Sequence, residues 1–322
     1  MTGASRAAGG DGEALHALLL YDCEESLGAR AVPYVREGLD CGETVMAVVS
    51  PAAEQILSSA LGSDAARVRW QAGDVSYGRL GAMFEGFRRF LAEQRAGGVA
   101  MRLLAENDTV GAHDRLAAYL RFEAMANEVY HPYGYRWACL YNLRAYSAES
   151  LRHVRQVHPR LLEPGGRAIR NGEYLEPSTY VARAGPLPRP PAAAQLDLQV
   201  TGPCHLVLFR QLLRRWAEIH GMGGDDADGV VIAVGEAVTN ALKHGSPPVR
   251  VRAWTAHDLA RVHVHDRGSR SIPATAGYHQ PSPDLDHGYG LWLARQLADV
   301  VTTHSDRAGT TIALDFPLAA RP

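Results

Sequence analysis

Three polar side chains of different chemical types recur at intervals of four within the segment GEAVTNALKHG, residues 235–245. Glu236, Asn240 and His244 interrupt an otherwise apolar run, and this spacing places them one above the next along a helix. A carboxylate can orient a nucleophile or accept its proton, and an amide oxygen is a hard ligand for Mg²⁺. Lys243, the only lysine of the chain, can neutralise a polyphosphate beside them. The set predicts a nucleotide-phosphate site, and a solvated helix face is the plainer alternative.

An amphipathic helix over residues 230–244 would position this polar line. At about 100° per residue, the three polar side chains fall within about 80° of one another. Gly235, beside the apolar face, predicts a close approach to a sheet, and Gly245 suits a left-handed C-terminal cap. The apolar face itself consists of Val231, Val234, Val238, Ala241 and Leu242.

Three glycine-bearing motifs follow downstream: HDRGS, HGYGLWL and AGTT. Asp266 ends a predicted strand, where its carboxylate could accept a hydrogen bond from an adenine amino group, and Gly268 would let the backbone turn beneath that ring. Gly288 and Gly290 open a predicted helix whose free N–H groups suit anionic oxygens. Thr310 could supply a hydroxyl near the base. Each motif alone is weak evidence for a nucleotide site, but in this order after ExxxNAxKH the set is strong evidence.

These motifs resemble the GHKL ATP-binding fold over about residues 200–318, in particular the anti-sigma-factor serine/threonine kinases of the RsbW type. The resemblance implies that Glu236 is the general base and that Asn240 carries the Mg²⁺ bound to ATP. It implies that Asp266 recognises adenine and that the second glycine box forms a lid over the phosphates. The ATP-binding residues implied are Asn240, Lys243, His244, Asp266, Gly268, Gly288, Gly290, Leu291 and Thr310.

Two departures from the family pattern bear on catalysis. Arg270 replaces the second glycine of the first box, and Asp286 and His287 occupy the stretch where some relatives keep an arginine. ATP binding is therefore better supported than phosphoryl transfer. We keep two hypotheses: a serine/threonine kinase acting on an anti-anti-sigma (STAS) partner, and an ATP-binding partner-switch module without phosphotransfer. A sensor histidine kinase would need a dimerisation helix pair with a phosphoacceptor histidine, and no such pattern precedes Gln195.

A Pro/Ala-rich segment, residues 182–195, reads as a semi-rigid linker. It predicts a sensory domain over residues 1–181 and an ATP-binding domain over residues 196–322. In the first domain, apolar runs at 15–21, 44–50, 99–106 and 136–142 alternate with helical patterns at 24–39, 83–93 and 113–127. This order predicts a parallel α/β sheet. In the second domain, a mixed sheet with helices on one face is expected, which is an α/β two-layer sandwich.

The first domain resembles the MEDS family of sensory modules, named after methanogens, methylotrophs and the DcmR regulator. The resemblance rests on HALLLYDCEE, VREGLDCGETVMAVVSP and ACLYNLRAYSAESLRHVRQVHP. It implies a RecA-like sheet without ATPase motifs and detection of a small organic molecule. Candidate ligand contacts at strand ends are His16, Tyr21, Glu37 and Tyr141, with ordinary core and capping roles as the alternative.

The remaining histidines form no recognisable ligand set by their spacing. His131, His153 and His158 are expected at the surface. His263 and His265 share one strand face, and a hydrated sheet face explains them.

The composition indicates a cytosolic protein. The net charge of −2 over 322 residues gives no electrostatic case for nucleic acid or an anionic membrane. Four dispersed cysteines form no CxxC pair, and the N-terminal tail lacks the apolar segment of a signal peptide. The expected cofactors are ATP and Mg²⁺. The expected partners are an anti-anti-sigma STAS protein, an alternative sigma factor, a small organic ligand and, in a homodimer, a second copy of the chain.

Overall fold

Two compact units make up the computed structural model of the chain. The first comprises Met1–Val75, Phe90–Gly111 and Ala126–Leu175, and the second Ser76–Arg89, Ala112–Met125 and Glu176–Pro322. The structure describes residues 15–72, 79–107, 113–183, 187–269, 271–282 and 288–318. Arg270, Asp286 and His287, on which the sequence comparison of the glycine boxes depends, lie outside the described residues, as do residues 184–186 of the expected linker.

A seven-stranded sheet forms the first unit, in the order β3-β2-β4-β5-β1-β6-β7. All neighbouring strands pair in parallel except β6 and β7, which are antiparallel. The strands are β1 (Leu15–Tyr21), β2 (Thr44–Val49), β3 (Arg69–Ala72), β4 (Met101–Glu106), β5 (Arg136–Asn142), β6 (Arg160–Leu162) and β7 (Ala168–Arg170).

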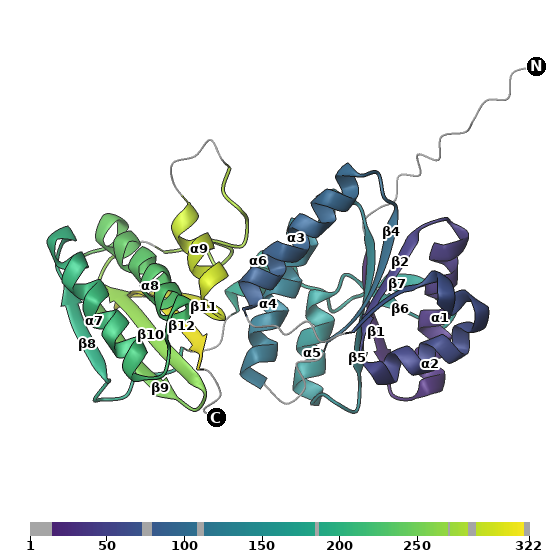
Figure 1. The fold of residues 1–322 in the computed structure, drawn as a ribbon, viewed down its shortest axis with the longest axis horizontal. Coiled ribbons are helices and arrows are strands. Elements are labelled where there is room, and N and C mark those ends of the chain that lie inside the picture. The colour runs from purple at the N-terminus through teal and green to yellow at the C-terminus, as the bar shows by residue number, and fades with distance from the viewer. Residues whose placement is uncertain are drawn as a thin grey trace, which may run out of the picture. The chain divides into compact units, whose positions relative to one another are not determined.

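Helices cover both faces of this sheet, with α1 and α2 on one face and α5 on the other (Figure 1). Parallel strands covered on both faces are continuous apolar runs, which is why β1 and β5 are buried along most of their length. The predicted parallel α/β fold is confirmed. The helices that precede the second sheet in the chain are α1 (Glu24–Asp40), α2 (Pro51–Leu61), α3 (Leu80–Ala96), α4 (His113–Val129), α5 (Ala148–Val157) and α6 (Pro177–Ala182), with short 3₁₀ turns at Gly62–Arg67 and His131–Tyr133. Of these, α6 belongs to the second unit. Both α3 and α4 contribute residues to each unit.

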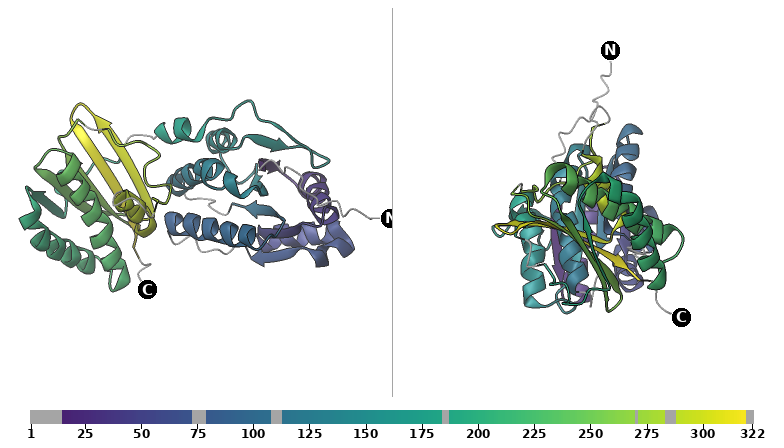
Figure 2. Two further views of the ribbon diagram at one scale, coloured as in Figure 1. Left: turned by 90° about the horizontal axis from the view of Figure 1, so that it is seen from above. Right: turned by 90° about the vertical axis from the view of Figure 1, so that its left-hand side faces the viewer.

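The second unit contains a five-stranded sheet in the order β11-β12-β10-β9-β8. Helices α7 and α8 lie along one face of it (Figure 2), so the predicted two-layer sandwich is confirmed. The mixed sheet was wrong, because every strand pair among the described residues is antiparallel. The elements are β8 (Leu196–Val200), a 3₁₀ turn (Pro203–His205), α7 (Leu206–Ile219), α8 (Asp225–His244), β9 (Val249–Ala256), β10 (Leu259–Asp266), α9 (Tyr289–Leu297), β11 (Val300–Asp306) and β12 (Gly309–Pro317).

Helix α8 is amphipathic as expected, with Val234, Val238 and Ala241 in the apolar core of the second unit. Two details of the expectation were wrong. A Cβ at Gly235 would meet only the guanidinium of Arg210, at 3.6 Å from Nε, so this glycine permits no close approach to the sheet. Gly245 ends the helix with φ −100°, which is not the left-handed conformation.

No helix in the described parts of the chain has both the length and the apolar character needed to cross a bilayer.

Candidate nucleotide site

The carboxylate of Glu236 and the amide of Asn240 lie against the start of helix α9. A Cβ placed on Gly290 would stand 2.6 Å from Glu236 Oε2 and 3.1 Å from Asn240 Nδ2. Both side chains are half-buried on α8. A side chain at position 290 would push the ends of these two side chains aside, so glycine leaves them in this position. The structure thus brings together a carboxylate, an amide and the first turn of a second helix.

The first turn of α9 is available to an anion. Gly288 is the N-cap residue, with φ 99°, and its lack of a side chain leaves the first-turn N–H groups without a side-chain cap. No acidic residue lies in that turn. The N–H groups of an uncapped first turn carry partial positive charge and favour anionic oxygens.

Asp266, at the end of β10, is fixed by two backbone donors. Its Oδ1 accepts hydrogen bonds from the N–H of Ser246, at 3.1 Å, and of Gly268, at 2.7 Å, and the side chain is 5% exposed. A Cβ on either Gly245 or Gly268 would collide with Oδ1. These two glycines therefore allow the end of α8 and the turn after β10 to close around one carboxylate.

Thr310 lies beside Asp266 on the neighbouring strand. The two residues are register partners in the antiparallel pair of β10 and β12, and Thr310 is 4% exposed. Its Oγ1 lies 3.1 Å from Ser305 Oγ. Gly309, with φ 133°, packs so closely on the Asp266 carbonyl that a Cβ would overlap it. Asp266, Gly268 and Thr310 therefore form a second group at the end of the sheet.

The other residues expected to bind ATP are placed differently. Lys243 and His244 are exposed at the last turn of α8. The side chain of Leu291 belongs to the apolar core of the second unit, so only its backbone N–H, in the first turn of α9, is left for a ligand.

Arg295 and Gly277, which the sequence motifs do not include, fasten the preceding loop to α9. Arg295 is 3% exposed; its Nε donates to the carbonyl of Ala276, at 2.9 Å, and its Nη1 to that of Val301, at 2.8 Å. Its guanidinium carbon lies 3.9 Å from the centre of the Tyr278 ring, and burial lowers the pKa of Arg295. Gly277, with φ 80°, packs against the Leu291 backbone, where a Cβ would stand 2.8 Å from its carbonyl. An arginine within the apolar run LWLARQL was the available signal.

The four candidate sensory residues of the first unit do not share one place. Tyr21 and Tyr141 lie near the carboxyl ends of β1 and β5, where ligands of parallel sheets bind. Tyr21 donates a hydrogen bond of 2.5 Å to Glu106 Oε1, and burial is the main cause that raises the pKa of Tyr21.

The other two candidates lie toward the amino ends of strands. His16 is the second residue of β1, near the amino end of that strand. Glu37 lies on α1 and pairs with Arg102, at 2.7 Å, near the amino end of β4.

Two expectations about histidines were wrong. His158 is fully buried, not at the surface, because it follows α5 directly and turns into the packed face of the sheet. His263 is 5% exposed, not hydrated, and the Trp254 ring lies edge-on to it at 4.8 Å. In contrast, His131 is exposed as expected and His153 is half-buried.

Two parts of the chain match the models of known families. Residues 15–159 match the model of the MEDS family, the methanogen/methylotroph DcmR sensory domain. Residues 201–316 match the model of the histidine kinase-like ATPase domain. The chain therefore carries a MEDS domain followed by a histidine kinase-like ATPase domain, and the latter contains the Glu236, Asn240 and Gly290 arrangement.

The solved structures that match this chain resemble it only weakly. The RsbU and RsbW domains of Rv1364c from Mycobacterium tuberculosis are 26% identical with a TM-score of 0.30, over 40% of this chain and 34% of that one. This chain thus spans about a third of that relative. The mycobacterial sensor histidine kinase MprB is 17% identical with a TM-score of 0.26, over 38% of this chain and 96% of that one. The search of curated proteins returned no match.

Proposed function

We propose that this protein is a cytoplasmic anti-sigma factor regulated by its sensory domain, which uses ATP and Mg²⁺ to phosphorylate a serine or threonine of an anti-anti-sigma partner of the STAS type. The same surface would sequester an alternative sigma factor. The histidine kinase-like ATPase domain supports an ATP-binding regulator of the kinase type. The serine/threonine specificity and both partners rest on the motif resemblance and are proposals.

The donor set around Gly290 fits ATP and Mg²⁺. Asn240 would supply an amide oxygen to the ion, and the first-turn N–H groups of α9 would receive phosphate oxygens. Since Oδ1 of Asp266 already accepts two backbone hydrogen bonds, Oδ2 would accept the adenine amino group. When bound, Mg²⁺ offsets charge on the phosphates. Glu236 would orient the partner's hydroxyl group and accept its proton.

One observation carries the proposal: the Glu236 carboxylate and the Asn240 amide both contact the position of Gly290 at the uncapped start of α9. The test incubates the full chain with γ-labelled ATP and a candidate STAS protein. We expect label on the partner from the wild-type chain and from Glu218→Gln, a control at an exposed glutamate of α7. Glu236→Gln should bind ATP and transfer no label, whereas Asn240→Ala should bind MgATP weakly. Equal transfer by Glu236→Gln and wild type would rule out the general-base role.

A second candidate function is an ATP-binding partner switch that transfers no phosphate. It is favoured by Arg270 in the first glycine box and by the lack of an arginine between it and Arg295. Here nucleotide would act as a structural ligand for partner capture. A pure binder carrying Glu236→Gln should keep sigma-factor control in cells, while a kinase should lose nearly all of it.

The sensor histidine kinase alternative is not supported by the described residues ahead of the ATPase domain. Between α5 and β8, the helix that they contain is α6, which has six residues. A phosphoacceptor hairpin needs two long helices, and the described residues of this segment do not form them.

A further inference from the structure

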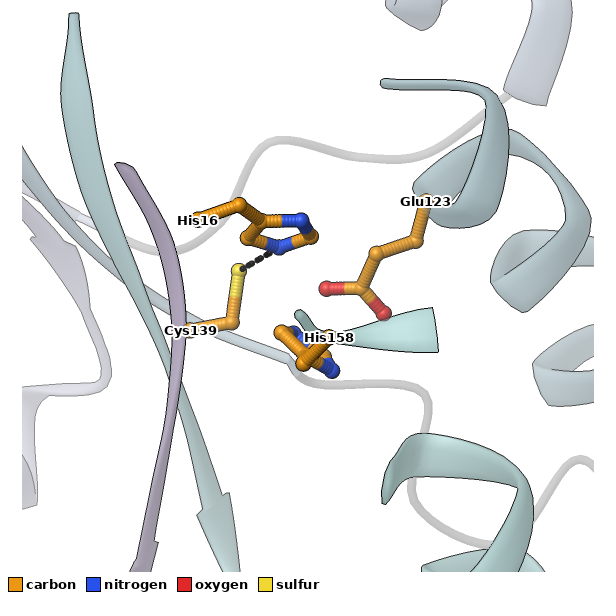
Figure 3. A group of neighbouring side chains, drawn as sticks. All are labelled: His16, Glu123, Cys139 and His158. Atoms are coloured by element: carbon orange, nitrogen blue, oxygen red, sulfur yellow. Dashed lines mark hydrogen bonds between the residues drawn. The ribbon is translucent and has the colours of Figure 1, made fainter. Parts of the chain in front are cut away.

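Four side chains with metal-ligand atoms converge on one buried point beside the first sheet. They are His16 on β1, Cys139 on β5, His158 after α5 and Glu123 on α4, and Figure 3 shows them pointing toward one another. Their ligand atoms all lie within 4.8 Å of one another. The residues are 3%, 7%, 0% and 6% exposed, respectively. Such a group is separate from the nucleotide site and plays no part in the proposed phosphotransfer.

The tautomer of His16 is set by its neighbours. Asn127 donates its side-chain N–H to the carbonyl of Val157, at 2.9 Å, so its amide oxygen faces His16. This oxygen lies 2.9 Å from His16 Nδ1, which must therefore be the donor. The lone pair of the neutral ring is then on Nε2, which lies 3.4 Å from Cys139 Sγ. Glu123 lies one helical turn before Asn127 on α4, so it reaches the same place.

His158 is oriented in the same way. Its Nδ1 lies 2.7 Å from the carbonyl of Val154, an acceptor, so Nδ1 carries the proton and Nε2 the lone pair. Asn171 donates to the backbone carbonyl of His158, at 2.8 Å, and fixes the chain there. In protein metal sites, ligating histidines have their second ring nitrogen held in this way by a carbonyl or a carboxyl group.

Aromatic rings enclose the group. Trp137 stacks on His16 with ring centroids 4.8 Å apart, and Tyr141 meets His158 edge-on at 5.9 Å. The rings of His16 and His158 lie 4.3 Å apart. An apolar shell of this kind keeps water from a site and strengthens the electrostatic attraction inside it.

We propose that these four residues bind a divalent transition-metal ion, with Zn²⁺ as the best fit. Two imidazole nitrogens, a cysteine sulfur that binds metal once deprotonated, and a carboxylate are all ligand types that Zn²⁺ accepts. Ligand atoms of a tetrahedral zinc site are roughly 3.3–3.8 Å apart, as follows from bond lengths of about 2.0–2.3 Å. The limit of 4.8 Å between ligand atoms therefore requires a contraction of at most about 1.5 Å. Four protein ligands close the coordination sphere, so the ion would tie α4 to β1 and β5 as a structural centre.

Cobalt provides the direct test on the full chain. After chelation, the apo chain is titrated with Co²⁺, and metal content after Zn²⁺ loading is measured by mass spectrometry. We expect one ion per chain, the visible absorption of tetrahedral Co²⁺, and a thiolate charge-transfer band in the near ultraviolet. Absence of stoichiometric binding by the folded wild-type chain would overturn the proposal.

Variants assign the ligands. Cys139→Ser should abolish the charge-transfer band and weaken binding by about 100-fold or more, whereas Cys204→Ser, at an exposed cysteine, should change neither. Asn127→Ala, which releases His16, should weaken binding roughly 10–100-fold. Glu123→Gln keeps the side-chain shape and serves if Cys139→Ser does not fold, as judged by circular dichroism. Binding unchanged in both Cys139→Ser and Glu123→Gln would contradict the assignment.

Discussion

Gly290 on α9 lies against Glu236 on α8, so closely that a Cβ at position 290 would stand 2.6 Å from the carboxylate oxygen Oε2. This relationship ties the conformation of the proposed catalytic side chain to the absence of a side chain on the neighbouring helix. A substitution at Gly290 should therefore affect nucleotide binding more than the stability of the fold.

Gly290→Ala should push Glu236 and Asn240 aside and weaken MgATP binding about 10-fold, which corresponds to about 1.4 kcal/mol. The free energy of unfolding should change little, because alanine favours a helix by about 0.5–1 kcal/mol and offsets part of the strain. Calorimetric titration with MgATP and urea unfolding measure the two quantities.

Gly28→Ala is the matched control, since it is a helical glycine of α1 with nothing within 4 Å of its Cβ position. It should leave MgATP binding unchanged. If Gly290→Ala bound MgATP as tightly as wild type, the approach of α9 to Glu236 would have no role in nucleotide binding.

Asp266→Asn should separate the structural and recognition roles of this carboxyl group. The amide retains an oxygen for the N–H groups of Ser246 and Gly268, so the fold should remain. Its NH₂ group cannot accept a hydrogen bond from adenine, so the preference for ATP over GTP should fall about 10-fold or more. Competition binding with the two nucleotides measures this ratio. Asp266→Ala, which leaves the buried N–H groups without their acceptor, should instead reduce stability by about 1–3 kcal/mol. An unchanged ATP/GTP ratio in Asp266→Asn would exclude Asp266 from base recognition.

Only the helical part of the candidate nucleotide site could be predicted from the sequence, because helical spacing is a local property. The periodicity of α8 placed Glu236 and Asn240 on one side, but the close approach of Gly290 to both side chains joins distant parts of the sequence and was not predicted. The direction in which the strands pair is harder to predict from the sequence. Alternating residues in β9 and β10 identify strands and their faces, but not whether β8 pairs in parallel or antiparallel.

The metal-ligand group could not be found from spacing. His16 and Cys139 are 123 residues apart, and the parallel pairing of β1 with β5 alone brings them to one face. The sequence groups His158 with the nearby His131 and His153, which do not belong to the ligand group. Helices α2 and α5 were also missed, although Ser50 and Ser147 cap them in the usual way, with hydrogen bonds of 3.3 and 3.1 Å from the backbone.

Replacing Arg295 by methionine should destabilise the ATPase domain by about 2–4 kcal/mol. The change removes the hydrogen bonds that Arg295 donates to the carbonyls of Ala276 and Val301 and removes its stacking on Tyr278. Urea unfolding of the full chain measures the effect. Arg307→Met, at an exposed turn position, should change the free energy of unfolding by no more than about 0.5 kcal/mol. Equal midpoints for the two variants would show that Arg295 does not fasten the loop to α9.

His263 should make stability depend on pH. Burial, and then the charges of Arg252, Arg261 and His265, lowers the pKa of His263 from 6.5 to about 4. Above pH 6.5 the residue is neutral in both the folded and the unfolded chain, and its contribution to stability is complete. Between these two pKa values only the unfolded chain binds the proton, so the free energy of unfolding falls as the pH falls. The loss by pH 4 should be on the order of 1–3 kcal/mol.

Urea unfolding at pH 7.5 and pH 4.5 measures the difference for the wild type, for His263→Gln and for His131→Gln, whose histidine is exposed. His263→Gln should show a smaller difference between the two pH values, whereas His131→Gln should match the wild type. The same difference in all three chains would mean that His263 does not stay neutral in the folded protein.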